Sequence, residues 1–529
     1  MEGAEAPVTR RRAPLARLGP AGSPAADLAE RLVRQRLLVK DHQSAAGGRA
    51  EPVVDVAHEA LLTHWDRLAR WIDERRDDLR LCDVLGRSVE DWARSGCHHT
   101  YITLGPERAR VAREALARLG RTPTPLEDAF LDPAARAAWL LGRDTEAWVQ
   151  AGRGTAGLWD AQRFAGFADL APGSVAPPQG AARDFLTASF AACLVTLVGQ
   201  PRARAACGQA LGALGDPRFD PDTWHLPADP TLGFREVPAG PFRMGTDPEQ
   251  DPNGWSDEEP QHDQDLPALW LARWPVTVAQ FTAFVAATGY RPAEADAWQG
   301  HPNHPVVWVS WHDARAYRAW HGDCLRGLAA ARLAALAPPV GAAPGRAAPP
   351  DQEPEPQAAA RRFWAAVAAG QLQPGLPSEP EWEKAARGTD GRLYAVGNTL
   401  TPDLANYKDT GLRATSAVGC FPAGAGPYGC EDQTGTVWEW TRSLWGPDYM
   451  HVGFKYPYDP EDGREDSEAS DDLARVLRGG AFSRGYHLCR GAVRDRNYPS
   501  DRLVNGGFRV VWSPFLCTLS PLNSEPLNL

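Results

Sequence analysis

A single cysteine stands near the end of the chain, in the stretch "GGAFSRGYHLCRGAVRDRN" of residues 479–497. A thiol becomes a nucleophile or a soft-metal ligand when neighbouring cations stabilise its thiolate. Cys489 has arginine neighbours, but the stretch holds no second cysteine that could serve as its partner in redox cycling. This leaves two hypotheses: Cys489 is a catalytic thiol, or the stretch is a surface whose other side chains bind a ligand.

Histidines offer a second chemistry, metal binding. His58, Glu59 and His64 share a predicted helix, but a zinc-binding pair of this type needs its second histidine four residues after the first. The gap here is six residues, so packing or hydrogen bonding at a helix end is the better interpretation. Ordinary loop or helix-start positions are also expected for the histidines of the second half, His301, His304 and His312.

Length and composition predict a folded protein of several domains. The chain has 529 residues, of which 43% are hydrophobic and 23% charged, and a prior of about 150 residues per domain gives three or four units. The net charge of -11 argues against a dedicated nucleic-acid binder. Nine sparse cysteines, no signal-peptide pattern and no apolar run long enough to span a bilayer predict a soluble cytoplasmic protein with no membrane partner.

The first half is expected to be mainly helical. Residues 1–26 read as a flexible lead and 27–143 as a helical domain, in which the helical pattern resumes at Val53. Gly47 and Gly48 mark a hairpin or loop between helices. Residues 144–231, which include the helical stretch "ARAACGQALGALGDPR", are predicted to be a helical spacer.

From Gly233 onward the texture changes to short strands between Gly, Pro, Asp and Asn residues. "FREVPAGPFRMGT" predicts a strand, a turn and a second strand. A helix follows Pro275, with Phe281, Phe284 and Val285 on its buried side, and Ser310 is a candidate cap for the next helix. Residues 325–372 are rich in Ala and Pro and are expected to form an insertion of low order, and 514–529 a tail.

The phrases "VVDVAHEALLTHWDRLARWIDERRDDLRL" and "RARVAREALARLG" resemble the winged-helix end of bacterial STAND-type signalling ATPases over residues 27–140. The sequence contains no GxxxxGK[ST] loop that could wrap nucleotide phosphates. The resemblance therefore implies a docking or oligomerisation role, with an effector or an ATPase as partner.

Six motifs in order resemble the formylglycine-generating enzyme and sulfatase-modifying factor family over residues 232–513. They are "VPAGPFRMGT", "PVTVAQFTAFVAATGY", "HPVVWVSWHDARAYRAW", "LPSEPEWEKAARG", "GTVWEWT" and "RVLRGGAFS" with "GGFRVV". The resemblance implies a variant of the C-type lectin fold with little regular secondary structure. Together with the helical first half, the expected fold class is α+β.

The catalytic positions of that family are not matched. Its enzymes bind copper(I) and the substrate thiol through two cysteines, which correspond here to Tyr486 and Gly491. The HxxxHxE helix of the related iron-dependent sulfoxide synthases is also absent. The resemblance thus implies neither copper nor iron.

The family also implies a structural calcium ion, held by oxygen ligands. The alternative is that Glu439 only caps a backbone group or pairs with a cation. The residues that match the calcium loops are Asn406, Tyr407, Gly435, Val437 and Glu439.

A third branch of the family consists of the variable proteins of diversity-generating retroelements, in which adenine changes in Asn codons rewrite a C-terminal binding surface. Residues 479–508 resemble that pattern without a gap. The matched framework is Gly479, Gly480, Arg490, Ala492, Arg494, Pro499, Arg502, Gly507 and Phe508.

The positions between the framework residues carry the predicted ligand contacts. The residues at the Asn-codon positions all belong to the set that adenine changes can give, since Lys, Glu, Gln, Met and Trp do not occur there. Their mixture of Tyr, Arg, Ser, Gly and Asn is typical of adaptable binding surfaces. With Tyr486 included, the predicted ligand-binding residues are Ser483, Arg484, Gly485, Tyr486, Leu488, Val493, Asp495, Arg496, Asn497, Tyr498, Asp501, Leu503, Val504 and Asn505.

The sequence predicts a non-catalytic recognition protein that binds an unknown protein or surface ligand through the variable region 479–508. Two alternatives stay open: a copper-dependent oxidase of the formylglycine-generating type, and a STAND-type signalling component.

Overall fold

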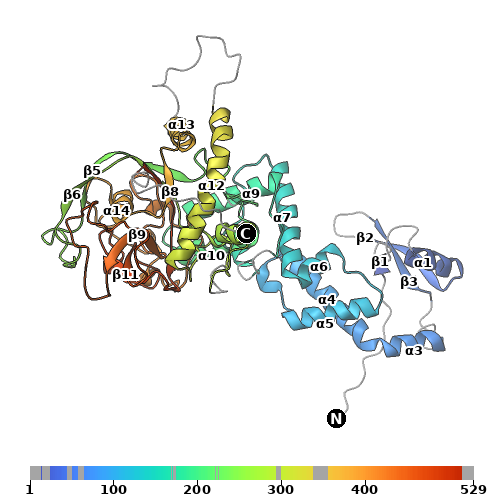
Figure 1. The fold of residues 1–529 in the computed structure, drawn as a ribbon. Helices are drawn as coiled ribbons and strands as arrows, with labels where there is room; N and C mark the ends of the chain where they lie inside the picture. The colour runs from blue at the N-terminus through green and yellow to red at the C-terminus, as the bar shows by residue number, and fades with distance from the viewer. Residues whose placement is uncertain are drawn as a thin grey trace, which may run out of the picture. The chain divides into compact units, whose positions relative to one another are not determined.

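The computed structural model describes residues 13–14, 24–44, 50–57, 65–167, 170, 174–220, 222–223, 225–293, 299–336 and 355–514. The chain divides into two compact units, residues 1–132 and 133–529 (Figure 1). The predicted domain boundary at 143 is displaced, because helix α7 (Pro133–Gln150) packs on α9 (Gly180–Thr196) in the second unit. The predicted lead and tail lie almost entirely outside the described residues.

The first unit combines a small antiparallel sheet with helices. The sheet has the order β1-β3-β2, and Trp92 packs edge-on against Phe130 in the helical core, with 5.7 Å between the ring centroids. The elements are β1 (Ala13–Pro14), α1 (Pro24–Arg34), β2 (Leu38–Ser44), β3 (Ala50–Val56), α3 (Asp66–Glu74), α4 (Arg76–Arg94), the 3-10 turn η2 (His99–Tyr101), α5 (Pro106–Arg118) and α6 (Pro125–Leu131).

Strands β2 and β3 confirm the hairpin alternative around Gly47 and Gly48. The helix predicted from Val53 is wrong at its start, because Val53 and Val54 pair with β2 and are buried in strand β3. Two adjacent β-branched residues suit a strand better than a helix. His58, Glu59 and His64 lie outside the described residues, and the winged-helix interpretation stays a prediction.

The second unit begins with α7, α8 (Ala161–Ala165), α9 and α10 (Pro201–Ala213). The predicted helix over "ARAACGQALGALGDPR" is confirmed as α10, but the segment is not a spacer. Asn303 Nδ2 donates to the Gly208 carbonyl at 2.9 Å and to Asp216 at 2.8 Å, and buried Arg204 pairs with Asp403. The helices are thus part of the same unit as residues 232–513.

The described strands of this unit form two four-stranded sheets and a hairpin. One sheet has the order β11-β10-β9-β12 and mixes antiparallel pairs with the parallel pair β12 and β9. The other has the order β4-β7-β13-β8, and β5 pairs with β6. The strands are β4 (Phe234–Val237), β5 (Gly240–Met244), β6 (His262–Leu266), β7 (Leu269–Ala272), β8 (Gln373–Gly375), β9 (Trp438–Gly446), β10 (Ala474–Arg478), β11 (Asp495–Asn497), β12 (Gly506–Gly507) and β13 (Val511–Ser513).

Capping boxes begin three helices of this unit. Thr277, Ser310 and Ser378 accept the backbone N–H three residues later and open α11 (Val278–Thr288), α12 (Trp311–Ala335) and α14 (Glu379–Arg387). The predicted cap at Ser310 and strand-turn-strand at 234–244 are confirmed. Three 3-10 turns complete the elements: η4 (Lys408–Thr410), η5 (Pro422–Gly424) and η6 (Tyr486–Leu488).

The prediction of low order over 325–372 is wrong at both ends. Helix α12 continues to Ala335, and α13 (Glu355–Ala368) packs against it. Leu325, Phe363 and Trp364 are fully buried in the main core. Their apolar spacing outweighs the Ala and Pro content that suggested an insertion, and residues 337–354 lie outside the described part.

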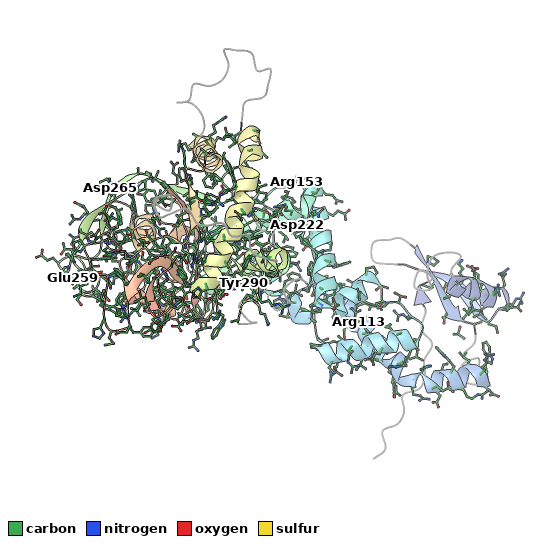
Figure 2. All side chains as sticks on the ribbon, viewed as in Figure 1. Arg113, Arg153, Asp222, Glu259, Asp265 and Tyr290 are labelled. Atoms are coloured by element: carbon green, nitrogen blue, oxygen red, sulfur yellow. The ribbon has the colours of Figure 1, made fainter. Side chains whose placement is uncertain are left out.

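The interior of the second unit is densely filled by side chains, whereas charged residues such as Asp265 lie at its edge (Figure 2). The observed mixture of helices and strands agrees with the α+β expectation. In the described part of the chain, no helix has the length and apolar character needed to cross a membrane.

Candidate functional site

The framework of residues 479–508 faces inward. Eight of its nine predicted members are buried, and Arg502 is half-buried. Gly479 and Gly480 have φ values of 103° and 78°, in the region that glycine tolerates best. A Cβ atom at Gly480 would lie 2.6 Å from the Cys489 sulfur. These two positions therefore require glycine.

Three framework arginines anchor the segment to distant parts of the second unit. Arg490 pairs with Asp251 at 2.6 Å and Glu258 at 2.7 Å, and Arg502 approaches Asp313 at 3.2 Å. Arg494 donates through Nε and Nη2 to the two carboxylate oxygens of Glu379, at 2.7 and 2.8 Å. Planar guanidinium groups suit such two-point contacts.

The Arg494 pair also fixes the charge of Glu379. Burial alone would raise the pKa of this carboxyl, but the positive charges of Arg494 and Arg478 outweigh burial and hold the pKa below its usual range. Glu379 is therefore ionised at neutral pH. The framework arginines are thus engaged in ion pairs within the second unit.

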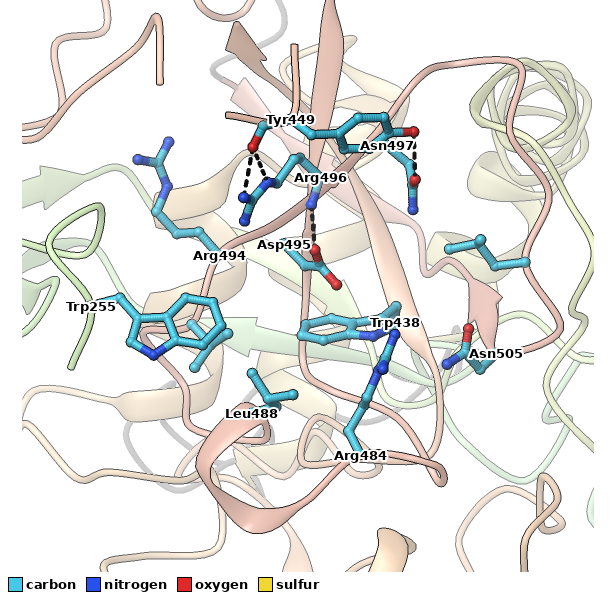
Figure 3. A pocket seen from close by; sticks show the side chains of 12 residues that line it. Trp255, Trp438, Tyr449, Arg484, Leu488, Arg494, Asp495, Arg496, Asn497 and Asn505 are labelled. Atoms are coloured by element: carbon cyan, nitrogen blue, oxygen red, sulfur yellow. Dashed lines mark hydrogen bonds between the residues drawn. The ribbon is translucent and has the colours of Figure 1, made fainter. Parts of the chain in front are cut away.

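The residues between the framework positions gather around one pocket of about 480 Å³ (Figure 3). Strand β11 supplies one wall, and the loops around Arg484 and Asn505 supply others. The structure brings together eight of the predicted ligand-binding residues as pocket lining: Arg484, Leu488, Val493, Asp495, Arg496, Asn497, Leu503 and Asn505.

The other predicted residues lie outside the pocket lining. Tyr486 and Val504 are 51% and 52% exposed. Ser483 accepts a hydrogen bond from Asn505 Nδ2 at 2.9 Å. The remaining three are half-buried: Gly485, Tyr498 and Asp501.

Two predicted contacts are buried more deeply than the interpretation as surface residues requires. Val493 is 0% exposed and belongs to the main hydrophobic core. Asn505 is 7% exposed, because its carbonyl accepts from the Trp438 backbone N–H while its amide bonds Ser483. The alternation that suggested outward side chains fails here, since the segment is mostly loop rather than strand.

Sequence reasoning missed four lining residues, Trp255, Trp438, Tyr449 and Arg494. Trp438 lies in the "GTVWEWT" motif, whose neighbouring residues were predicted as calcium ligands. Arg494 was assigned to the framework. Trp255 and Tyr449 come from loops far away in sequence, and no local pattern marks them.

Arg496 and Tyr449 form one wall of the pocket. The Arg496 guanidinium donates to the Tyr449 carbonyl at 2.9 and 2.6 Å and stacks on Trp445. The Tyr449 hydroxyl donates to Asp501 at 2.7 Å and lies 3.0 Å from the side-chain amide of Asn497. Burial and the Asp501 contact raise the pKa of Tyr449 to about 12, so this hydroxyl stays protonated.

Asp495 is the acidic group of the pocket. Its carboxylate accepts the Arg496 backbone N–H at 2.9 Å. Burial raises its pKa, although the charges of Arg496 and Arg484 oppose that shift. A partly desolvated carboxylate of this kind responds strongly to the charge of any bound group.

Cys489 does not have the surroundings of a reactive thiol. The residue is 1% exposed and packs with Tyr394, Ala405 and Tyr407. Burial raises the pKa of its thiol to about 12, so the thiolate is scarce at neutral pH. Its role is core packing beneath the pocket loop.

The histidines expected to be ordinary are held in structural contacts. His304 is buried, its Nδ1 lies 3.0 Å from the Thr415 hydroxyl, and burial lowers its pKa to about 3. Burial also lowers the pKa of His301, and His312 lies 3.1 Å from Asp471. Within the described residues, no group of three or more His, Cys, Asp or Glu side chains could hold a metal ion.

The residues expected to bind calcium do not fit a cation as they are arranged. Both carboxylate oxygens of Glu439 pair with Arg509 at 2.6 Å, and one also accepts from Trp382 Nε1 at 2.7 Å. Asn406 Oδ1 accepts the Thr410 hydroxyl at 3.1 Å. The Asn406 carbonyl accepts the Thr436 N–H. The geometry matches the alternative in which Glu439 pairs with a cation of the protein itself.

The other three residues expected to bind calcium are also buried and lie close to Asn406 or Glu439 in the sequence. They are Tyr407, Gly435 and Val437. None of the five residues expected to bind calcium lines the pocket at residues 483–505.

Two domain signatures match different parts of the chain. The signature of the sulfatase-modifying factor enzyme 1-like domain matches residues 228–514, and that of the novel STAND NTPase 1 matches residues 1–100. Both resemblances read from the sequence are confirmed, with the second displaced toward the N-terminus.

Hercynine oxygenase of Mycolicibacterium thermoresistibile is 31% identical over 314 residues, which cover 56% of this chain and 63% of that protein. The chain thus spans less than two thirds of that relative. Formylglycine-generating enzyme of Thermomonospora curvata is 27% identical, over 56% of this chain and 99% of that enzyme.

Among solved structures, Treponema denticola variable protein 1 is 23% identical over 53% of this chain and 95% of that chain, with a TM-score of 0.35. So low a score carries no inference about function. The domain signature, by contrast, covers more than half of the residues and includes the whole pocket. The chain therefore belongs to the sulfatase-modifying factor enzyme 1-like domain family.

Proposed function

We propose that this chain is a non-catalytic recognition protein that binds a ligand through residues 483–505, as a variable protein of a diversity-generating retroelement. One observation carries the proposal. Framework residues are buried and locked by glycines and ion pairs, whereas twelve of the fourteen predicted contacts are at least partly exposed. A surface built in this way changes its side chains without changing its support.

Thiol chemistry is the rival function. The positions of the family's copper-binding cysteines are an exposed tyrosine, Tyr486, and a glycine, Gly491, against which Arg387 packs. Cys489 is buried with a raised pKa. The rival predicts copper(I) binding and oxidation of a peptide thiol that Cys489→Ser abolishes, while the recognition function predicts neither.

Selection from a displayed library of random 12-residue peptides tests the recognition function. The bait is the full chain, and its counterpart carries Arg484→Asn, Asp495→Asn, Arg496→Asn and Tyr498→Asn. Peptides selected on the unchanged chain should bind the fourfold variant at least about 10-fold more weakly. A matched control carries changes at exposed sites elsewhere in the second unit, Val195→Asn, Val198→Asn and Arg243→Asn. Equal loss in the control would refute binding at 483–505.

The retroelement origin has its own test. A near-copy of the coding segment for residues 479–508, differing only at adenines and lying beside a reverse-transcriptase gene, would support it. If the flanking DNA holds no such copy, the retroelement origin fails, whereas ligand binding at this surface does not depend on it.

For the first unit we propose docking to an effector or an ATPase partner in the cytoplasm, through a winged-helix-like domain. The match of residues 1–100 to the novel STAND NTPase 1 signature supports a signalling context. A neighbouring gene that encodes a P-loop protein, and its co-purification with the full chain, would support this role. A full chain that purifies without that protein would contradict it.

A further inference from the structure

The pocket at residues 483–505 contains two hydrogen-bond donors that the protein itself leaves unsatisfied. Trp438 is 1% exposed, and its indole Nε1 is buried with no hydrogen-bond partner among the described residues. Buried donors are normally paired, because leaving one unpaired costs about 1–3 kcal/mol. Trp438 also lines the pocket, so its unpaired indole N–H is a candidate donor to an acceptor of a bound group.

Arg484 is the second donor. Its side chain is exposed, lines the same pocket, and forms no hydrogen bond or ion pair with the part of the chain that the structure describes. Arg484 and Trp438 both line this pocket (Figure 3). A guanidinium and an indole N–H together suit an oxygen acceptor with negative charge.

The charge balance of the pocket decides between an anionic and a cationic ligand. Arg494 pairs with Glu379, whereas in the described part of the chain the guanidinium of Arg496 donates to a neutral carbonyl, that of Tyr449. With Arg484 added, two guanidinium groups that form no ion pair within the described residues face the carboxyl of Asp495, and the half-buried carboxyl of Asp257, whose pKa burial raises, also interacts with Arg496. The pocket therefore attracts an anionic group, and Asp495 limits how strongly it does so.

The rim of the pocket indicates what carries the anion. Trp255 and Tyr449 line the pocket and are 41% and 39% exposed. Tyr486 and Val504, on the same segment as the lining residues, are about half exposed. Exposed aromatic and aliphatic groups around a charged centre are typical of protein-binding surfaces rather than of phosphate-backbone grooves.

We propose that this pocket receives an acidic side chain, Asp or Glu, of a partner protein, between the Arg484 guanidinium and the Trp438 indole N–H. This inference rests on the proposed recognition function and adds the chemical class of its ligand. Asp495 lowers the affinity for this ligand, because its negative charge lies in the same pocket as the incoming carboxylate.

Paired selections on the full chain test the assignment. A random 12-residue peptide library is selected on the unchanged chain and, in parallel, on Arg484→Glu. The unchanged chain should enrich Asp and Glu, and the charge-reversed variant should enrich Lys and Arg. Selected acidic peptides should bind Arg484→Gln and Trp438→Phe at least about 10-fold more weakly and Asp495→Asn about 3-fold more tightly or better. Arg243→Gln, an exposed arginine outside the pocket, is the matched control.

Each outcome decides. Peptides that depend on residues 483–505 but lack acidic residues, or that bind Arg484→Gln unchanged, overturn the acidic ligand and leave the recognition function standing. A selection that yields no peptide dependent on residues 483–505 overturns both. Tighter binding of a 15-residue oligothymidylate than of the acidic peptides identifies a nucleic acid as the ligand and overturns the proposal. Thermal unfolding of Trp438→Phe, whose ring is part of the core, shows whether its loss of binding reflects loss of the fold.

Discussion

At the scale of single residues, two arginines of the segment 479–508 differ in burial and in their ion-pair partners. Arg490 is 1% exposed and holds two acidic residues from a distant loop, whereas Arg484, six positions earlier, is exposed and holds none within the described structure. The same residue type thus stabilises the fold at position 490 and, in the proposed function, contacts a ligand at position 484. The difference follows from the partners each side chain meets.

Replacing Arg490 by Gln should destabilise the second unit by about 3–5 kcal/mol, because two buried carboxylates, Asp251 and Glu258, would lose their cation. Arg484→Gln should change the free energy of unfolding by less than about 0.5 kcal/mol. Denaturant unfolding of both variants measures the contrast. Similar stability of the two variants would contradict the division into support and surface.

A second residue-scale prediction concerns Asp432, which is 6% exposed. Burial, with help from the charge of Glu431, raises its pKa to about 7. Between the unfolded pKa near 4 and this value, the folded state holds a proton that the unfolded state has lost. Its contribution to stability therefore falls as the pH rises through this window, by about 1.4 kcal/mol per unit at most.

Asp432→Asn removes this titration, so the variant should gain stability relative to the unchanged chain as the pH rises from 5 to 8. Unfolding curves at several pH values measure that difference. Asp263→Asn, at an exposed site, should show no such trend. A difference for Asp432→Asn that is independent of pH would show that its pKa is not raised.

At the scale of elements, the second unit includes helices that lie outside the matched family signature. Helix α10 approaches the loop around Asn303 so closely that Gly212 has no room for a side chain. The hydrogen bonds from Asn303 to Gly208 and Asp216 hold the same contact. The helical segment before residue 228, where the family signature begins, is thus integral to the second unit.

Two glycine substitutions test that contact. Gly212→Ala should destabilise the second unit by about 1–3 kcal/mol, because its Cβ would collide with Asn303. Gly142→Ala, in the middle of α7 with nothing within 4 Å, should stabilise by up to about 1 kcal/mol. Thermal unfolding compares the two. Equal effects would indicate that α10 is not docked on this loop.

Local sequence patterns predicted some elements and missed others for physical reasons. The predicted cap at Ser310 combines a hydroxyl with a carboxylate three residues later, a signal confined to one helical turn. The Ala and Pro content of residues 325–372 gave a wrong prediction of low order, because the side chains that bury Phe363 and Trp364 come from other elements. Composition does not report such long-range burial.

At the scale of the whole molecule, the pocket joins residues that no sequence window contains. Trp255, Trp438 and Tyr449 line it together with strand β11, although they are separated by long stretches of chain. The resemblance to a known family located the variable segment, whereas Val493 and Asn505 were misjudged because burial depends on the folded loop. The described structure thus groups eight of the predicted contacts around one pocket and buries Val493 and Asn505, while ligand binding there stays a prediction.

The recognition function is tested most directly by randomising the residues of the proposed contact surface. A library of the full chain, displayed on yeast, is randomised at the exposed or half-exposed positions and selected for binding to an unrelated folded protein, hen lysozyme. A control library randomises the framework at Gly480, Arg490, Ala492 and Arg494. The randomised positions are Ser483, Arg484, Gly485, Leu488, Asp495, Arg496, Asn497, Tyr498, Asp501, Leu503 and Val504.

The measurement is the fraction of folded, protease-resistant clones in each library, followed by enrichment of lysozyme binders. The recognition function predicts that most clones of the first library stay folded and yield binders, while the framework library loses its fold. A first library that unfolds as readily as the framework library, or that stays folded and yields no binder, would contradict it.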